Sequence, residues 1–292
     1  MGGINHSCDD VMELISKLPE LMRRQGWIKG AILMEKWQRG SPNSIPESGN
    51  HDVSTINMAW VLGHGRAQNV YKEAVKEKLW VDETGRNCIV NNLIRERNRL
   101  PNDVGERVNI GNVGEGLVHT PCGLVEFQND WQIQLKKHKE KYSADPDDLT
   151  AALANFQFCY TVKGWVDRLA DRNGKTRYKV TINKVGVFVQ DTYDFNDTSW
   201  EDRFYSQNLG VWNCENGYLR KILGVPFINQ YSLQNKVFRD WRIKYRHGGD
   251  FLVYSDIKVL DTNDSFEFSS LDEFPSWNSE EYKNKYCRAY SG

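Results

Sequence analysis

Apolar residues in the first half of the chain recur at three- and four-residue intervals, which is the spacing of one face of an α-helix. The first series consists of Val11, Leu14, Ile15, Leu18, Leu21 and Met22. It predicts a helix between Asp9 or Asp10 and Gly26, and Pro19 predicts a split into two short helices, because proline lacks an N–H. Further helices are predicted at residues 31–37, 52–62, 67–79, 87–99, 129–142 and 148–155, with a loop at 40–50.

The second half changes to the alternation of a β-strand. Residues 156–166 and a strand that begins at Arg177 flank Asn173-Gly174, a strong signal of a two-residue hairpin turn. Strands are also predicted at 185–193, 238–245 and 251–260, and the tail after Asp261 is expected to strap the fold or to be mobile. The predicted fold is α+β, with a helical N-terminal half packed on a strongly twisted antiparallel β-sheet or half-barrel. We expect two regions, 1–150 and 151–292, the second ending in the polar tail.

The composition excludes several classes of protein. The 292 residues carry 38 Lys and Arg against 39 Asp and Glu, which argues against binding of nucleic acid through overall charge. No apolar run approaches the roughly 18 residues of a membrane-spanning helix, and the first residues lack a signal-peptide pattern. Six scattered cysteines form no CxxC pair, so reduced thiols are the default expectation, and the sequence leaves open whether two of them pair in space.

The segment 189–197 is the first candidate for chemistry. It follows a predicted strand and contains Asp191, Tyr193, Asp194 and Asp197. Carboxylates at this spacing suit a hard divalent cation such as Mg²⁺, with Asp191 and Asp194 as ligands. The alternative is an Asx turn that closes the strand, in which an aspartate bonds its own backbone.

Residues 235–251 are locally basic in a chain of nearly neutral charge, and we expect them to face the acidic strand end across a water-filled cleft. The basic residues that would share one face of the predicted strand are Arg242, Lys244 and Arg246. They would clamp a phosphate or pyrophosphate. His247 would transfer protons, and Gly248-Gly249 would turn the backbone so that Asp250 returns toward the site. The alternative is a solvated strand face followed by a Gly-Gly hairpin.

Short groups of residues between about positions 11 and 260 carry a family resemblance. They are Leu18-Pro19-Glu20, Gly26-Trp27, Gly30-Ala31, Leu33-Met34, Trp37, Asp191-Thr-Tyr-Asp-Phe195, Leu209-Gly-Val-Trp212, Asn235, Phe238-Arg239, Trp241-Arg242 and Gly248-Gly-Asp-Phe251. In these residues the chain resembles a family of bacterial domains of unknown function found beside type VI secretion and polymorphic-toxin genes. The resemblance implies an antibacterial effector that a secretion apparatus delivers into a rival cell, and a cognate immunity protein in the producer.

A second, local resemblance concerns the segment 191–196. Its Asp191, Tyr193 and Asp194 are similar to the Asp-x-Tyr-Asp core of colicin M and its relatives. That family cleaves lipid II between the polyprenyl chain and the pyrophosphate, with a divalent metal, in a half-barrel β domain. The family's His-Arg pair would fall at Trp200-Glu201 and does not match, and the nearest basic residue is Arg203. Either His247 and Arg246 or Arg242 supply these two roles from the next predicted strand, or the similarity is a coincidence of a few residues.

The expected function is therefore Mg²⁺-dependent hydrolysis of a lipid II-type peptidoglycan precursor in the periplasm of a rival cell. The catalytic residues would be Asp191, Tyr193, Asp194, Arg242, Arg246 and His247, and the substrate-binding residues Arg239, Lys244 and Asp250. Residues 1–150 would serve docking or delivery, and 151–292 would carry the toxin activity. The expected partners are the immunity protein, a delivery protein and the lipid-linked substrate, without nucleic acid and without a transmembrane segment. The alternatives are a non-enzymatic binding toxin or adaptor, and third a nuclease.

Overall fold

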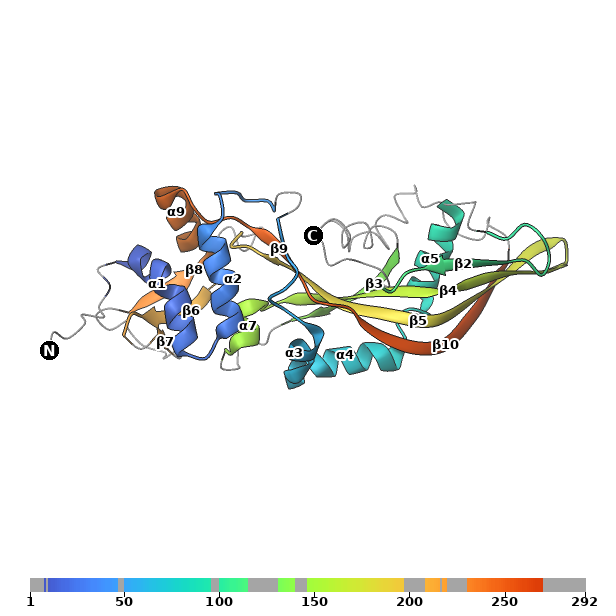
Figure 1. Ribbon diagram of the computed structural model, residues 1–292, viewed down its shortest axis with the longest axis horizontal. Coiled ribbons are helices and arrows are strands. Elements are labelled where there is room, and N and C mark those ends of the chain that lie inside the picture. The colour runs from blue at the N-terminus through green and yellow to red at the C-terminus, as the bar shows by residue number, and fades with distance from the viewer. Residues whose placement is uncertain are drawn as a thin grey trace. The chain divides into compact units, whose positions relative to one another are not determined.

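The computed structural model describes residues 8, 10–46, 50–95, 100–114, 131–139, 146–196, 208–215, 217–219 and 230–269. The chain forms two compact units, each built from separate stretches of sequence (Figure 1). Unit 1 comprises residues 1–56, 139–156 and 191–254, and unit 2 comprises 57–138, 157–190 and 255–292. Each unit takes residues from both sides of position 150, where the sequence indicated a change between regions.

Helix α1 (Val11–Arg24) begins unit 1 as one continuous helix. Asp10 caps its N-terminus by accepting a hydrogen bond from a backbone N–H of the first turn at 2.8 Å. The predicted break at Pro19 is wrong, because another side chain replaces the hydrogen bond that proline removes. Pro19 leaves the carbonyl of Ile15 without its helical donor, and the Gln38 side chain donates to that oxygen at 2.6 Å.

Helix α2 (Ile28–Arg39) packs against α1 and against the short helix α7 (Asp148–Ala152), so the helices predicted at 31–37 and 148–155 are confirmed. The two carboxylate oxygens of Asp148 accept hydrogen bonds from the first turn of α2 at 2.9 and 3.1 Å. A carboxylate here satisfies N–H groups that have no partner within the helix. Gly30 allows α2 and α7 to approach closely, because a Cβ at this position would lie 2.6 Å from the Cβ of Ala151.

Short strands complete unit 1. Strand β1 (His51–Asp52) pairs in parallel with β9 (Phe251–Tyr254). A separate antiparallel sheet has the order β7-β6-β8, made of β6 (Asn208–Asn213), β7 (Gly217–Leu219) and β8 (Tyr231–Gln234). The loop predicted at 40–50 separates α2 from β1.

A disulfide bond joins Cys8 to Cys214 across 206 positions of sequence. Their Cα atoms are 5.7 Å apart, within the range that disulfides span. The hydroxyl of Tyr231 donates a hydrogen bond to the carbonyl of Cys8 at 3.1 Å. The default expectation of reduced thiols is therefore corrected for this pair, which anchors the start of the described chain to the three-stranded sheet.

Residues 235–245 form helix α9 (Asn235–Tyr245), and the strand predicted at 238–245 is wrong. Phe238, Trp241 and Arg242 are buried at helical spacing and form the inner face of α9. This face packs within unit 1 against α1 and β8. The alternating basic residues from Arg242 onward resembled a strand pattern, but the buried residues follow the helix period.

Unit 2 is built around a long hairpin. Strands β4 (Phe156–Arg172) and β5 (Lys175–Tyr193) pair antiparallel and are strongly twisted (Figure 1). The turn between them is Asn173-Gly174, with φ angles of 54° and 70°, as a turn that needs left-handed backbone requires. The predicted hairpin is confirmed, and the two strands expected at 177 and at 185–193 are one continuous strand.

Three further strands extend this sheet. Strand β10 (Lys258–Ser269) pairs with β5, while β2 (Arg107–Gly111) and β3 (Gln132–His138) pair with β4. The tail after Asp261 is thus part of the sheet as far as Ser269, and residues 270–292 lie outside the described part. The helix predicted at 129–142 is wrong at β3, where apolar residues alternate with polar ones along QIQL.

The helices of unit 2 are α3 (Met58–Gly63), α4 (Gly65–Glu77) and α5 (Glu83–Arg95). They confirm the predicted helices in outline, although β1 occupies residues 51–52. Asn57 begins α3 by accepting a hydrogen bond from the third backbone N–H that follows it, at 2.8 Å. Helices α4 and α5 both pack against β3.

The predicted α+β class is confirmed. The long strands pair antiparallel as expected, and β1 and β9 add a parallel pair. Within the described ranges, no helix is both long enough and apolar enough to cross a membrane.

Candidate functional site

The acidic strand end forms the last residues of β5, in unit 1. Asp191 is half-buried and Tyr193 is buried. Desolvation raises the pKa of Asp191 well above its usual value, the backbone N–H of Thr192 acts against this shift, and the charge of Asp194 adds to it. Burial also raises the pKa of the Tyr193 hydroxyl, and the charge of Asp191 acts in the same direction. Asp191 therefore retains a proton at higher pH than an exposed aspartate does.

Asp194 closes the strand with a local hydrogen bond. Its Oδ1 accepts from the backbone N–H of Asn196 at 2.9 Å, which is the geometry of an Asx turn. The alternative stated for this segment therefore holds for Asp194. Asp197 lies outside the described residues, as do Trp200-Glu201 and Arg203.

Tyr193 belongs to an aromatic cluster inside unit 1. Its ring stacks on Phe251 of β9, with centroids 5.4 Å apart, and meets Phe195 edge-on at 5.7 Å. Phe195 stacks on Phe238 of α9 at 3.9 Å and contacts Trp37 of α2 at 4.8 Å. These rings fix the strand end against α2, α9 and β9.

Asp250 is fully buried at the centre of a polar network beside these rings. Its Oδ1 accepts hydrogen bonds from Trp37 Nε1 at 2.9 Å and from Arg242, and its Oδ2 accepts from Asn196 Nδ2 at 2.9 Å. The backbone N–H of Asp250 donates to Asn43 Oδ1 at 2.6 Å. Burial raises the pKa of Asp250, while Trp37, Arg242 and Asn196 act in the opposite direction.

The Gly248-Gly249 turn places Asp250 in this network. Gly248 has a φ of 102°, and a Cβ there would lie 2.7 Å from a ring carbon of Trp37. Both glycine N–H groups donate at 3.0 Å, one to the carbonyl of Gly40 and the other to that of Trp37. The turn brings Asp250 next to the acidic strand end, where it accepts a hydrogen bond from Asn196, and next to Arg242.

The clamp predicted from Arg242, Lys244 and Arg246 is wrong as a shared face. Residues two positions apart on a helix are rotated by about 200°, so Lys244 points away from Arg242. Arg246 lies past the end of α9, where it is the C-cap residue with a left-handed backbone. Arg242 pairs with the buried Asp250, whereas Lys244, Arg246 and His247 are exposed at the end of α9.

Arg239 and the acidic strand end are in direct contact. Arg239 Nη1 donates to the carbonyl of Phe195 at 2.9 Å, and Asn235 Nδ2 donates to the carbonyl of Asn196 at 3.4 Å. The basic and acidic segments are thus neighbours, as expected. They meet through hydrogen bonds and stacked rings, which corrects the expected water-filled cleft.

A Mg²⁺ ion at the end of β5 would compete with a proton on Asp191 and with a backbone hydrogen bond to Asp194. A raised pKa opposes the ionised form of Asp191 that a cation requires, and Asp194 already accepts a backbone hydrogen bond. In the part of the chain that the structure describes, no three His, Cys, Asp or Glu side chains gather as metal ligands. We assign no reaction step to a metal.

A groove of about 450 Å³ lies along α2 in unit 1. Its side-chain lining consists of Ile32, Glu35, Lys36, Arg39, Asn50 and Phe251, and Gly40 and Gly249 contribute as well. The sequence analysis did not identify this groove. A signal was present in the four-residue spacing of Ile28, Ile32 and Lys36, which places two apolar residues and a cation on one helix face.

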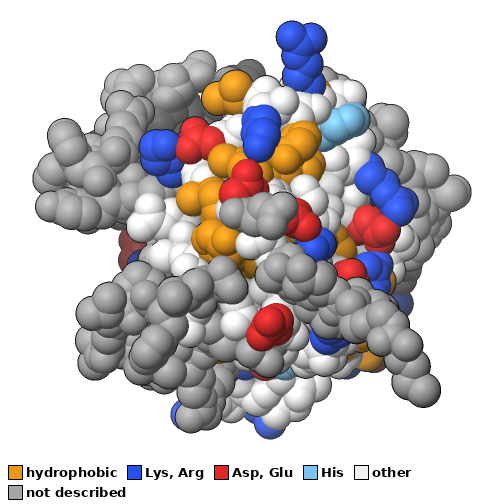
Figure 2. All heavy atoms as spheres, turned by 90° about the vertical axis from the view of Figure 1, so that its left-hand side faces the viewer, with side chains coloured by type: hydrophobic (Ala, Val, Ile, Leu, Met, Phe, Trp, Pro, Cys, Tyr) orange, Lys and Arg blue, Asp and Glu red, His pale blue; other side chains and the backbone are white. Residues whose placement is uncertain are grey.

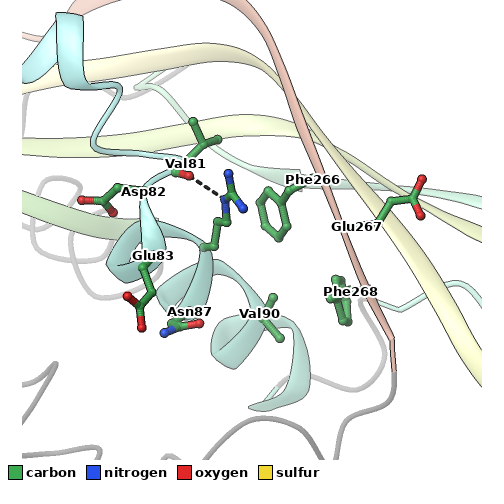
Figure 3. A pocket seen from close by; sticks show the side chains of 9 residues that line it. Val81, Asp82, Glu83, Asn87, Val90, Phe266, Glu267 and Phe268 are labelled. Atoms are coloured by element: carbon green, nitrogen blue, oxygen red, sulfur yellow. Dashed lines mark hydrogen bonds between the residues drawn. The ribbon is translucent and has the colours of Figure 1, made fainter.

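Unit 2 contains another pocket, of about 370 Å³, between the start of α5 and the end of β10 (Figure 3). Phe266 and Phe268 form its apolar side, and Asp82 and Glu83 lie at the start of the helix. The guanidinium of Arg86 lies 5.7 Å from the ring centre of Phe266, and its Nε donates to the carbonyl of Val81 at 2.6 Å. The candidate residues of the sequence analysis do not line this pocket.

Comparison with known proteins gives one match. The model of a protein family matches two overlapping stretches, residues 14–225 and 220–269. No curated protein and no solved structure matches the chain. The functional argument therefore has to come from the residues themselves.

Proposed function

This chain belongs to DUF6402, a family of unknown function, and we propose that it is an antibacterial effector that hydrolyses a polyprenyl-pyrophosphate-linked peptidoglycan precursor. The observation that carries the proposal is the carboxyl pair at the end of β5. Asp191 has a raised pKa, and Asp194 is its charged neighbour. Two neighbouring carboxyl groups, one of which has a raised pKa, are an arrangement that acid–base hydrolysis uses.

In the proposed reaction, water attacks the phosphorus atom that carries the polyprenyl oxygen. Asp194 accepts a proton from this water, and Asp191 donates its proton to the departing polyprenyl oxygen. The products are a polyprenol and a soluble pyrophosphoryl fragment. Tyr193 is a positioning residue, because its stacked ring holds the backbone between the two carboxyl groups.

The basic residues of α9 have secondary roles in this proposal. Arg242 and Asp250 stabilise the protein that surrounds the strand end, since they form a buried ion pair. Arg246, Lys244 and His247 remain candidates for contact with the anionic substrate, because they are exposed. Mg²⁺ has no assigned step, and a requirement for it is tested by the assay below.

The proposal also includes the route of the protein. It would be made in the cytoplasm, carried by a delivery protein of a type VI secretion apparatus and released in the periplasm of a rival cell. A cognate immunity protein would protect the producer. These statements rest on the resemblance described above.

The test is an assay of purified protein with lipid II, with and without Mg²⁺ and EDTA. We expect release of a pyrophosphoryl fragment by the parent protein and a loss of about 100-fold or more in Asp191→Asn, which has no proton to donate. Asp240→Asn is the matched control, because Asp240 is an exposed aspartate paired with Lys236 on α9. If Asp191→Asn folds and hydrolyses lipid II as fast as the parent, the proposal is refuted.

A second candidate function is a binding toxin or adaptor without catalysis. The observation in its favour is the exposed end of α9, where Ile243 is 77% and Tyr245 40% exposed beside basic residues. Figure 2 shows hydrophobic side chains surrounded by Lys, Arg, Asp and Glu on one face of the molecule. Tight binding of a protein partner that Ile243→Ser abolishes, without turnover of lipid II, would favour this candidate.

A further inference from the structure

We propose that the groove along α2 binds an amphipathic anion, an apolar chain that carries a phosphate or pyrophosphate head group. The groove has about 450 Å³, within the range of about 300–1,000 Å³ that small-molecule sites usually occupy. It is lined by apolar and cationic side chains at different points along the same helix. This arrangement selects a ligand with two chemically different ends.

The outer face of α2 changes character along its length. Ile28 and Ile32 lie in its first half and are 47% and 38% exposed. Lys36 and Arg39 follow on the same face, one and two turns further along the helix. A ligand that lies along α2 would therefore place its apolar chain on the isoleucines and its anionic head near the two cations.

The cations of the groove are more accessible than the carboxylates that pair with them. The Arg39 side chain is 77% exposed, whereas that of Glu35, 2.5 Å away, is 32% exposed. Lys36 is 33% exposed, and its carboxylate neighbour Asp52 is 8% exposed. Glu35 is also held by Arg23 at 2.6 Å, so one carboxylate is shared by two guanidinium groups. The accessible charge in the groove is positive, which complements an anionic head group.

Phe251 and Lys36 give the groove a lining that is partly apolar. Phe251 lines it, and the ammonium group of Lys36 lies 4.7 Å from the centre of that ring. Lys36 also donates to the carbonyl of His51 at 2.8 Å, which holds the side chain in place. At the C-terminal end of α2, Gly40 and Gly249 approach so closely that a Cβ on Gly40 would lie 3.0 Å from Gly249 Cα.

The groove is linked by one contact to the proposed reaction site. Phe251 of the groove stacks on Tyr193, which directly precedes Asp194 in the sequence. The identification of the groove as the subsite for a polyprenyl pyrophosphate rests on the proposed function. Binding of an amphipathic anion rests only on the groove itself, so the two statements are tested separately.

The experiment is isothermal titration of the full chain with farnesyl pyrophosphate, farnesol and inorganic pyrophosphate, without added metal. We expect farnesyl pyrophosphate to bind at least about tenfold more tightly than either of the others, because only it uses both parts of the groove. Arg39→Gln and Ile32→Asn should each weaken its binding by about fivefold or more.

Matched controls exist for both variants. Arg24 pairs with Glu20 at the same helical spacing as Arg39 with Glu35, but on α1, so Arg24→Gln should bind as the parent does. Ile45 is 76% exposed in the loop after α2 and does not line the groove, so Ile45→Asn should also bind normally.

Several results would overturn the inference. The inference is wrong if pyrophosphate or farnesol binds as tightly as farnesyl pyrophosphate. It is also wrong if Arg39→Gln or Ile32→Asn binds farnesyl pyrophosphate as tightly as the parent does. Hydrolysis of lipid II by the parent protein is measured in parallel, and this measurement separates the two proposals. Groove-dependent binding by a parent protein that never hydrolyses lipid II would support the groove and reject the proposed function.

Discussion

At the scale of single residues, Asp191 and Asp250 show how differently two carboxyl groups respond to burial. Desolvation raises the pKa of both. Asp250 is compensated by Arg242 and by the side-chain N–H groups of Trp37 and Asn196. For Asp191, the backbone N–H of Thr192 lowers the pKa, whereas the negative charge of Asp194 raises it further. Asp250 is therefore a structural residue. Asp191 has fewer groups that stabilise its ionised form, so it is the carboxyl group that we assign to proton transfer.

The raised pKa of Asp191 predicts how stability depends on pH. Because the folded protein holds this proton more tightly than the unfolded chain, Asp191 stabilises the fold below the unfolded pKa and loses that contribution as pH rises through the folded pKa. Asp191→Asn removes this effect. We therefore expect the variant to gain stability over the parent as pH rises above the usual pKa of an aspartate, about 3.9, in urea unfolding followed by circular dichroism. A difference that stays constant over this range would contradict the assignment.

The sequence predicted part of this residue-level arrangement. The segment 191–194 and the return of Asp250 were identified from local spacing. The partners of Asp250 were not, because Trp37 and Asn43 lie 213 and 207 positions away and no local pattern links them. Local backbone bonds, such as the Asx turn of Asp194, follow from neighbouring residues, whereas networks of this kind require the fold.

At the scale of elements, α1 and α9 show why periodicity alone misled in two places. In α1, the apolar series was correct, but Pro19 did not break the helix because a residue of α2 replaces the missing donor. In α9, the alternating charges of 242–246 resembled a strand, while the burial of Phe238 and Trp241 follows the helix. Conversely, Asn173-Gly174 correctly predicted the β4–β5 hairpin, because these two residues themselves favour the left-handed backbone of the turn.

The contact between α1 and α2 gives a prediction at this scale. Gln38→Met leaves the carbonyl of Ile15 without a donor, which should cost about 1–3 kcal/mol of unfolding free energy. In a Pro19→Ala background the backbone regains an N–H for this carbonyl, so the same substitution should cost clearly less. A double-mutant cycle measured by urea unfolding checks this coupling, and purely additive effects would reject it.

At the scale of the whole molecule, the Cys8–Cys214 bond closes a loop of 206 positions. Such a cross-link restricts the unfolded chain, so replacing both cysteines by serine should lower the unfolding free energy by about 2–5 kcal/mol. A reducing agent should lower the urea midpoint of the parent to that of the double variant and leave the double variant unchanged. Cys88→Ser is the control, since Cys88 does not take part in the disulfide bond. If reduction leaves the parent midpoint unchanged, the bond does not stabilise the protein.

The interleaving of the two units sets the order in which they become complete during synthesis. Unit 1 needs residues 1–56 and also residues up to 254, whereas the long hairpin of unit 2 is finished at about residue 190. A ribosome therefore releases α1 and α2 long before α9 has been translated, and α9 carries Phe238 and Trp241, whose rings pack on Trp37. During that interval the nascent chain exposes aromatic side chains, and chaperone binding to its first 56 residues would be greatest then.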